Sequence, residues 1–319
     1  MTGFREWLAC PACRGGLSDE WVCCVCGARF ETADGILNLR LEGSLRTDAV
    51  RAFYSRAPFP GYPPHDTLAT LRAAAGRDRF VQLLDRAIAP DAAIAEVGCG
   101  TGQMSLCLAR GDRIVIAADL SRASLRLGAD AARRYGVERV LFVESDLHRP
   151  GLKPGIFDVV YCAGVLHHTP DSRRACRLVA DLVRPGGILI VGVYNRIARI
   201  PLRVRRGVAR LTRFRWVPFD PVLRGRRREP ERYDAWLRDQ YQHPEERSHT
   251  IGEVVRWFDE AGVDYLRCFP STVLDDDSAE LFAPAQDDWS VERWIAQLAW
   301  TATLGREGGL FFTIGRRRS

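Results

Sequence analysis

Lysine is almost absent from this chain of 319 residues. Lys153 is the only lysine among 46 basic residues, so arginine carries the formal net charge of +6. A bias of this kind indicates a GC-rich codon habit more than a requirement for guanidinium groups. It therefore weakens any conclusion about partners that is drawn from arginine clusters alone.

The chain also lacks an amino-terminal stretch with the charged and then apolar pattern of a signal peptide. No run approaches the roughly 20 apolar residues that are needed to span a bilayer. Five of the ten cysteines fall within the first 26 residues and the others are scattered in apolar segments, which fits a reducing compartment better than a disulfide framework. We therefore expect a cytoplasmic protein with one large domain and a small appendage, or with two medium domains.

Two C-x-x-C pairs, at positions 10–13 and 23–26, dominate the amino-terminal region. A glycine follows each pair closely, so each can form a tight knuckle with its thiolates pointing inward, and two knuckles make the closed four-sulfur tetrahedron of a structural zinc site. We expect Cys10, Cys13, Cys23 and Cys26 to be the ligands, with Cys24 as the substitute if Cys23 points away. A redox C-x-x-C and cysteines without a metal are the alternatives.

A short apolar run at 93–97 leads into alternating glycines and then into an apolar-periodic helix. Gly98, Gly100 and Gly102 allow a sharp turn with positive φ, and the helix points its N-terminal amides at a ligand. A dinucleotide-binding fingerprint would need glycine at position 103, where this chain has Gln. The pattern favours a nucleoside cofactor that is not a dinucleotide.

Further strand-like apolar runs follow at 113–119, 140–143, 157–162 and 187–194. Asp119 ends the first of them beside the glycine turn, where a carboxylate can accept hydrogen bonds from both ribose hydroxyls. Asp146 follows the second and could accept the adenine amino group. Strands that alternate with helices in this way predict an α/β fold with a doubly wound parallel sheet.

The segments E-V-G-C-G-T-G, A-A-D-L-S, S-D-L, F-D-V-V-Y-C-A-G-V-L-H-H and R-P-G-G-I-L-I-V stand in a characteristic order. From about Asp91 to Asn195 the chain resembles the class I S-adenosylmethionine-dependent methyltransferases, especially the ubiquinone and menaquinone biosynthesis enzymes. The resemblance implies S-adenosylmethionine (SAM) as cofactor and a seven-stranded Rossmann-like sheet. The cofactor contacts that it implies are Glu96, Gly98, Gly100, Gly102, Asp119, Leu120, Asp146 and Leu147.

Residues 1–40 resemble the small zinc-ribbon domain at the front of ribosomal RNA guanine methyltransferases and in activator subunits of translation-related methyltransferases. Residues 41–78 are expected to form a proline-rich linker, in which Tyr54 and Tyr62 either fold over the cofactor or pack the linker onto the core. Residues 79–319, beginning with a helix near 79–89, would then form the methyltransferase domain.

An arginine-rich insertion at about 196–247 interrupts the compact pattern of the family. Its first part has apolar residues at helical spacing with arginines elsewhere around the helix, so it is a membrane-surface element, a nucleic-acid contact, a lid over the acceptor or a solvated face. We expect it to serve acceptor recognition. Beyond it, a capping box at 250–253 predicts a helix, and the runs at 263–266 and 309–314 predict the last two strands. Trp289–Trp300 is expected to be a core helix, with a binding platform as the alternative.

His167 and His168 follow the fourth strand, at the sheet edge where an acceptor should approach. Either could be a general base for a hydroxyl acceptor, and a structural role is the alternative. His243 and His249, near the end of the insertion, are further candidates.

The turn after the fourth strand lacks the Asn/Asp-Pro-Pro-aromatic sequence of enzymes that methylate exocyclic amines of bases, and no proline precedes Cys162 as in cytosine carbon-5 enzymes. The leading interpretation is in-line methyl transfer to a small or lipid-like molecule, with peripheral membrane contact left open. The alternatives are an RNA methyltransferase acting on ring nitrogen or ribose with the zinc ribbon as its RNA-binding module, and a non-catalytic partner subunit.

Overall fold

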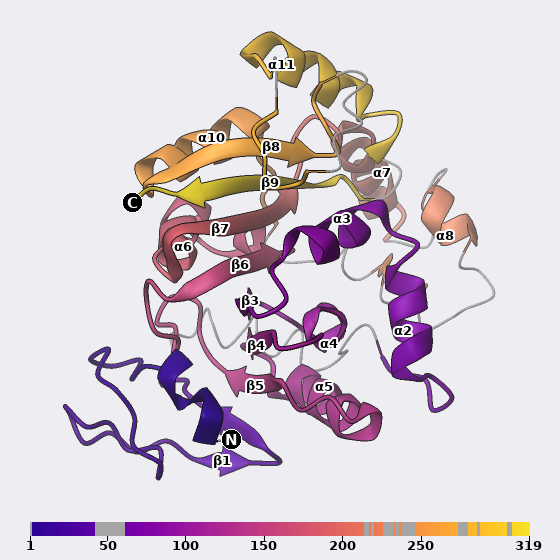
Figure 1. Ribbon diagram of the computed structural model, residues 1–319. Coiled ribbons are helices and arrows are strands. Elements are labelled where there is room, and N and C mark those ends of the chain that lie inside the picture. Colours follow the sequence, from indigo (N-terminus) through magenta and orange to yellow (C-terminus); the bar gives the residue numbers. More distant parts are fainter. Residues whose placement is uncertain are drawn as a thin grey trace.

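The computed structural model describes residues 2–41, 61–213, 217, 220–225, 233, 236–237, 241, 246–273, 280–285, 288–304 and 308–319. A mixed sheet of nine strands runs through the molecule in the order β1-β2-β5-β4-β3-β6-β7-β9-β8 (Figure 1). The strands are β1 (Thr32–Ala33), β2 (Ile36–Asn38), β3 (Ala93–Val97), β4 (Ile114–Asp119), β5 (Val140–Glu144), β6 (Phe157–Ala163), β7 (Val183–Tyr194), β8 (Val263–Phe269) and β9 (Leu310–Arg317).

Strands β3 to β9 are the seven that the sequence predicts, and their α/β arrangement confirms the expected Rossmann-like fold. The count of seven is wrong for the whole sheet, because the N-terminal segment (residues 2–41) adds β1 and β2 to the β5 edge. Strand β2 runs parallel to β5 with Leu37 opposite Val143. Asp34 and Gly35 both have positive φ, 57° and 75°, which suits the tight two-residue turn between β1 and β2.

The sheet is buried on both faces, as a doubly wound fold requires. Along β3, Ala93, Ala95 and Val97 belong to one apolar core and Ile94 belongs to the other. Helices α6 (Ser172–Ala180) and α10 (Ile251–Glu260) pack on the first face, and α3 (Arg79–Ala87) packs on the second (Figure 1). Leu8, Leu17 and other apolar residues of the N-terminal segment share the first core, so this segment is packed onto the sheet.

The ends of several helices follow from capping residues. Asp78 caps α3 by accepting from the amides of Phe80 and Val81, and the predicted Thr250–Glu253 capping box opens α10. Six other helices lie in the described part of the chain, besides the two that are considered next. They are η1 (Thr2–Trp7), α2 (Leu68–Ala75), α4 (Gln103–Leu108), α5 (Arg122–Tyr135), η2 (Leu166–His168) and α8 (Pro221–Gly225).

Two further helices carry exposed apolar side chains. Helix α7 (Ile200–Leu211) opens the insertion, and Pro201 lies in its first turn, where the missing N–H is no loss. Helix α11 (Ser290–Ala299) lies beyond β8 at the outer edge of the molecule (Figure 1). The expectation of a core helix is wrong for α11, because Trp289 and Trp294 are exposed and only Gln297 and Trp300 are buried. Among the described residues, no helix is long and apolar enough to cross a membrane.

Candidate cofactor site and metal centre

The glycine turn (residues 98–102) joins β3 to α4 and has the backbone geometry that its sequence predicts. Gly98, Gly100 and Gly102 have φ values of 76°, 56° and 77°. A Cβ atom on Gly98 would lie 2.0 Å from Val165 Cγ2, and one on Gly102 would lie 2.4 Å from Phe142 Cε1. Glycine is therefore required twice over at these two positions, by conformation and by the closeness of neighbouring elements.

Asp119 ends β4 directly beside this turn. Its Oδ2 accepts from the amide of Gly100 at 2.8 Å, and its Oδ1 accepts from the amide of Ser121 at 2.7 Å. Burial raises the pKa of Asp119, against the effect of these amides. Each carboxylate oxygen accepts one backbone bond and retains a second lone pair, so the group can still accept from ribose hydroxyls. Leu120 follows, partly buried, at the same strand end.

Glu96 lies on β3 two residues before the turn, and its side chain is buried. Ser105 of α4 donates a hydrogen bond from its hydroxyl to the Glu96 carboxyl. Burial raises the pKa of Glu96 to about 7, with the Ser105 hydrogen bonds acting in the opposite direction. A cationic neighbour would stabilise the ionised form of a buried carboxyl of this kind further, because opposite charges attract strongly where water is excluded.

Asp146 and Leu147 open the segment after β5, on the same edge of the sheet as Asp119. The Asp146 Oδ1 accepts from the amide of His148 at 2.8 Å and lies 3.0 Å from its Nδ1. Burial raises the pKa of Asp146, but the interactions with His148 outweigh it and the pKa is lowered. The carboxylate stays ionised and has acceptor capacity left for an adenine amino group.

The residues around the glycine turn fit a bound nucleoside. Tyr62, one of the two predicted lid residues, donates from its hydroxyl to the carbonyl of Thr101 at 2.8 Å, and Gln103 Nε2 donates to the carbonyl of Gly61. The segment at 61–62 thus lies against the turn. The Thr101 hydroxyl is buried and has no hydrogen-bond partner among the described residues, so the turn retains polar capacity. Tyr54, the other candidate, lies outside the described residues.

His167 and His168 lie in η2, which follows β6. Both are buried, and the His167 ring centroid is 4.2 Å from that of His168 and 4.0 Å from that of Tyr194 at the end of β7. Arg199 directly precedes α7, and its guanidinium lies 3.7 Å from the ring centroid of Tyr194. Because Val165 of the same turn touches Gly98, the histidines stand close to the cofactor side of the sheet.

The end of the insertion folds back onto these histidines. The amide of Arg247 donates to the carbonyl of His167 at 2.9 Å. The ring of His249 is buried, with Nε2 at 3.2 Å from Ser172 Oγ and Nδ1 at 3.5 Å from Glu253, and burial lowers its pKa. His249 is held by its neighbours on α6 and α10. His243 lies outside the described residues.

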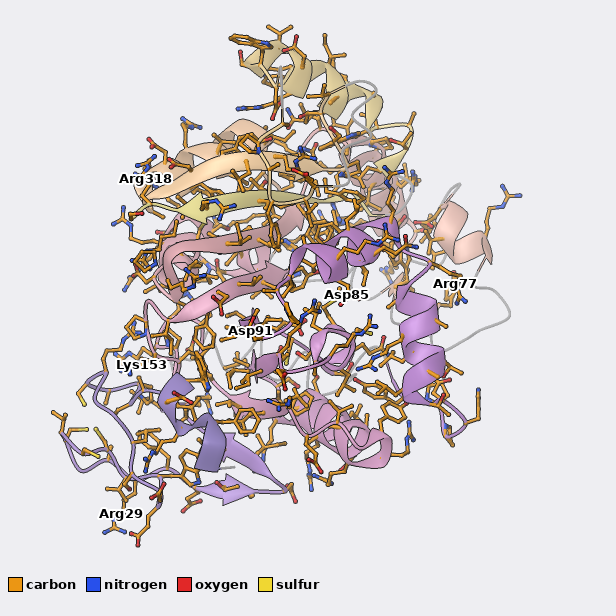
Figure 2. The ribbon with its side chains drawn as sticks, in the orientation of Figure 1. Arg29, Arg77, Asp85, Asp91, Lys153 and Arg318 are labelled. Carbon is orange, nitrogen blue, oxygen red and sulfur yellow. The ribbon has the colours of Figure 1, made fainter. Side chains whose placement is uncertain are left out.

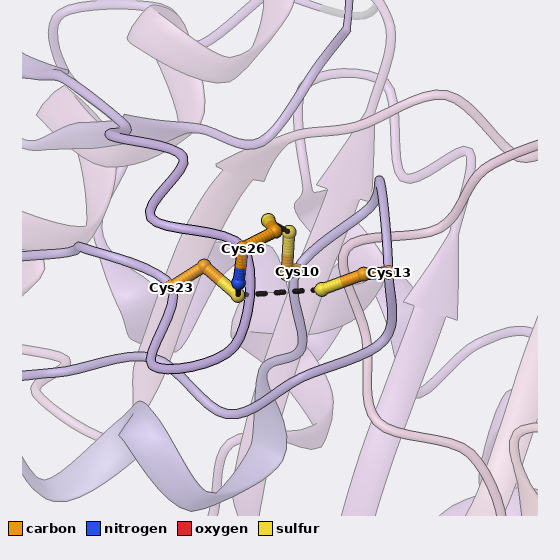
Figure 3. A group of neighbouring side chains, drawn as sticks. All are labelled: Cys10, Cys13, Cys23 and Cys26. Carbon is orange, nitrogen blue, oxygen red and sulfur yellow. Dashed lines mark hydrogen bonds between the residues drawn. The ribbon is translucent and has the colours of Figure 1, made fainter.

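The four predicted zinc ligands come together in the N-terminal segment (Figure 3). The Sγ atoms of Cys10 and Cys26 are 3.7 Å apart, those of Cys13 and Cys23 are 3.4 Å apart, and all four lie within 4.8 Å of one another. Tetrahedral zinc with Zn–S bonds of about 2.3 Å places its sulfurs roughly 3.8 Å apart. The cluster therefore has nearly the size that zinc requires.

The register of the second knuckle favours Cys23 over Cys24. The amides of Val25 and Cys26 point at the Cys23 Sγ, at 3.4 and 3.5 Å. These amides, that of Cys26 first, lower the pKa of the Cys23 thiol to about 6 and so favour the thiolate that a metal binds. Cys24 is exposed and outside the cluster.

The N-terminal segment also holds the segment after β5. The amide of Ala9 donates to the carbonyl of Gly151, and the amide of Lys153 donates to that of Trp7, both at 3.0 Å. Figure 2 shows Lys153 beside the N-terminal segment. Leu8 and Leu152 form an antiparallel bridge between them. The stretch with Asp146 and Leu147 is thus held at one end by β5 and at the other by the contacts of residues 151–153 with the N-terminal segment.

The sequence did not reveal three parts of this arrangement. Ser105, the partner of Glu96, carries no motif of its own, although its position on the helix after the glycines is a usable signal. Val165 matters only because it touches Gly98. The clamp at 151–153 joins residues more than a hundred positions apart, and no local pattern encodes it.

Comparison with known proteins agrees with this geometry. Residues 95–191 match a family described as a methyltransferase domain. An uncharacterized protein of Synechococcus is 30% identical over 261 residues, which cover 69% of this chain and 59% of that protein. A ubiquinone biosynthesis O-methyltransferase of Xanthomonas campestris is 33% identical over 111 residues, or 35% of this chain and 46% of that enzyme. The chain thus spans about half the length of the curated relatives it matches.

Among solved structures, the magnesium protoporphyrin IX methyltransferase of Synechocystis with bound SAH has a similar fold. Its TM-score is 0.50 at 15% sequence identity, and the match covers 85% of this chain and 99% of that one. At this level of identity the likeness concerns the fold alone.

Proposed function

We propose that this chain, which carries a class I S-adenosylmethionine-dependent methyltransferase domain, transfers the methyl group of SAM to a small or lipid-like acceptor. One observation supports this most strongly. The glycine turn and the Asp119 carboxylate are joined through the Gly100 amide, and this supports a role for Asp119 as the acceptor for the ribose hydroxyls beside the turn.

The cofactor would be held by residues at the carboxyl ends of three adjacent strands. The glycine turn accepts the close approach of the nucleoside, Asp119 accepts from the ribose hydroxyls, and Asp146 with Leu147 lines the adenine. Leu120 packs beside the same strand end. Glu96 lies on β3, just before the turn, and its ionised carboxylate would attract the positive charge of the cofactor. SAM supplies an already activated methyl group, so the chain needs to align the acceptor and exclude water.

The acceptor side would lie at the ends of β6 and β7. His167 and His168 stand there, under the end of the insertion, and a histidine in this place can take the proton of a hydroxyl acceptor. The ubiquinone biosynthesis O-methyltransferases among the relatives support an oxygen acceptor on a small, lipid-like molecule. Within the described residues, the insertion reaches this side through the amide of Arg247, which donates to the carbonyl of His167.

RNA is the second candidate acceptor. The four-cysteine cluster supports it, since zinc ribbons occur in RNA-modifying enzymes. Three of the arginines at the start of the insertion are, however, paired with carboxylates of the protein. Arg199 and Arg206 pair with Glu246, and Arg196 pairs with Glu253.

The test is incubation of the zinc-loaded protein with methyl-labelled SAM and fractionated cell extract. We expect label in the lipid or small-molecule fraction. Label in RNA, together with RNA affinity that falls steeply with salt, would favour the second candidate. Cofactor binding by calorimetry without transfer to any fraction would contradict both and identify a non-catalytic partner subunit.

A further inference from the structure

Helix α11 has its polar side chains turned toward the protein and its apolar side chains turned toward solvent. Glu292 and Arg293 are partly covered and Gln297 is buried. The opposite side is an exposed stripe that recurs at i, i+3, i+4 and i+7, together with the residue before the helix. We call it the α11 face: Trp289 is 66% exposed, Val291 62%, Trp294 56%, Ile295 58% and Leu298 58%.

This orientation is fixed by specific contacts. The Gln297 Oε1 accepts from Asn195 Nδ2 and from the amide of Ile251, both at 3.0 Å. The Arg293 side chain pairs with Asp288 at 3.1 Å, and its guanidinium lies 4.6 Å from the ring centroid of Tyr265. A rotation of α11 about its axis that buried the apolar stripe would break these polar contacts. The α11 face therefore remains exposed in the folded chain.

Helix α7 presents a second stripe of the same kind. Ile200 is 50% exposed, Val204 65% and Leu211 86%. These residues, the α7 face, follow one another at i, i+4 and i+11, so they lie along one side of the helix. The α7 sequence contains no acidic residue, and Arg203 and Arg210 are exposed on it.

The two helices are joined through their ends. The Arg199 side chain, at the start of α7, donates to the carbonyl of Gly308 at 2.5 Å. Asn195, just before it, donates to Gln297 of α11. Both helices thus lie on the β7, β8 and β9 side of the sheet (Figure 1).

We propose that the α11 and α7 faces bind the surface of an anionic lipid bilayer. Exposed apolar stripes of this kind are unusual on a protein without a partner. The exposed Trp289 and Trp294 are suited to the boundary between headgroups and acyl chains, where an apolar ring and a polar N–H are both accommodated. The arginines of α7 supply the charge that complements anionic headgroups.

Other occupants fit these observations less well. A nucleic acid would need cations at the centre of the surface, whereas the centre here is apolar and Arg199, Arg205 and Arg206 are paired inside the protein. A second copy of the chain would bury the tryptophans but would bring the unpaired charges of two α7 helices together. A bilayer accommodates both the apolar stripes and the arginines.

The experiment is co-sedimentation of the full chain with vesicles of phosphatidylcholine alone or mixed with phosphatidylglycerol. We expect binding to the mixed vesicles that weakens with added salt. The double variant Trp294→Gln/Leu298→Gln should lose affinity by about tenfold or more. The control Leu127→Gln removes an apolar side chain that is exposed elsewhere and should bind like the parent chain. Arg210→Gln should weaken binding to the mixed vesicles only.

Any one of three results would overturn the proposal. The first is that the parent chain does not sediment with mixed vesicles, and the second is that the double variant binds them as well as the control does. The third is that the parent chain elutes as a dimer while the double variant elutes as a monomer. Circular dichroism checks that each variant is folded. The measurement needs neither SAM nor an acceptor, so it stands apart from the proposed methyl transfer and either can fail alone.

Discussion

At the scale of single residues, Asp119 has two tasks that one substitution affects together. It holds the amides of Gly100 and Ser121, and it is the proposed acceptor for the ribose hydroxyls. Alanine would leave both amides without an acceptor and so would disturb the turn itself. Asparagine has nearly the same size and keeps one accepting oxygen, which makes it the cleaner probe.

We expect Asp119→Asn to weaken SAM binding by at least about tenfold, because each charge-assisted hydrogen bond lost costs on the order of 1.5 to 3 kcal/mol. Isothermal calorimetry measures the affinity, and a thermal melt checks the fold. Asp130→Asn, on the exposed side of α5, is the matched control and should bind normally. A folded Asp119→Asn protein with unchanged affinity would remove Asp119 from the cofactor site.

We expect Glu96 to make cofactor binding depend on pH. Its pKa is raised to about 7 by burial, so in the cofactor-free protein the group is largely protonated below pH 7. SAM carries positive charge and favours the ionised carboxyl, so binding releases a proton whenever the group was protonated. Linkage then requires the affinity to rise with pH up to about 7 and to level off above it.

Between about pH 6 and pH 8 we expect SAM affinity to rise by roughly tenfold, since one pKa unit corresponds to a tenfold change. Calorimetry in buffers of different ionisation enthalpy should also detect the released proton. Glu96→Gln cannot titrate, so its affinity should be flat over the same range. A pH-dependent Glu96→Gln protein would assign the effect to another group.

The geometry of the glycine turn and the position of Asp119 beside it could be predicted because their signals are local. Glycines at alternate positions after an apolar run specify the turn, and Asp119 follows at the end of the next run. The contacts of the Asp146 carboxylate with the amide and the ring of His148 could not be predicted in the same way. It depends on side-chain rotamers in a segment without regular structure.

At the scale of elements, periodicity shows which residues share a face but not which way that face points. The apolar spacing of Trp289–Trp300 predicts an amphipathic helix, and a core location is the natural inference from it. The structure reverses this, because Gln297 and Arg293 find hydrogen-bond partners on the protein side. The pairing of β2 with β5 was equally hidden, since it joins segments about a hundred residues apart.

The second metal knuckle gives a prediction in which two adjacent cysteines behave differently. We expect one zinc per chain, and Cys23→Ser should lose it, because Cys23 receives the amides of the knuckle and lies in the cluster. Cys24→Ser should keep the metal, since that thiol is exposed and outside the cluster. Elemental analysis of the two purified proteins decides the matter. The opposite pattern of metal retention would mean that the knuckle register is wrong.

At the scale of the whole molecule, the metal-binding segment and the cofactor edge are one packed structure. Leu8, Leu17 and Leu39 share a core with Val143 and Leu152. A Cβ atom on Gly151 would lie 2.5 Å from Leu39 Cβ, so the contact is tight. Metal binding by such a segment stabilises the fold around it. The order of the stretch that carries Asp146 and Leu147 should therefore depend on the metal.

Removal of zinc should consequently weaken SAM binding, although no cysteine of the cluster belongs to the proposed cofactor site. We expect chelation to lower the affinity by roughly fivefold or more, the lower end of ordinary coupling between two sites, and to lower the melting temperature. Calorimetry before and after chelation measures the first effect, and restored affinity after zinc is added back excludes irreversible damage. Cys23→Ser, already without metal, is the control and should not respond to the chelator. If metal analysis shows complete removal while SAM affinity is unchanged, the contacts at Gly151 and Lys153 hold the cofactor edge without help from the metal, and the two sites are independent.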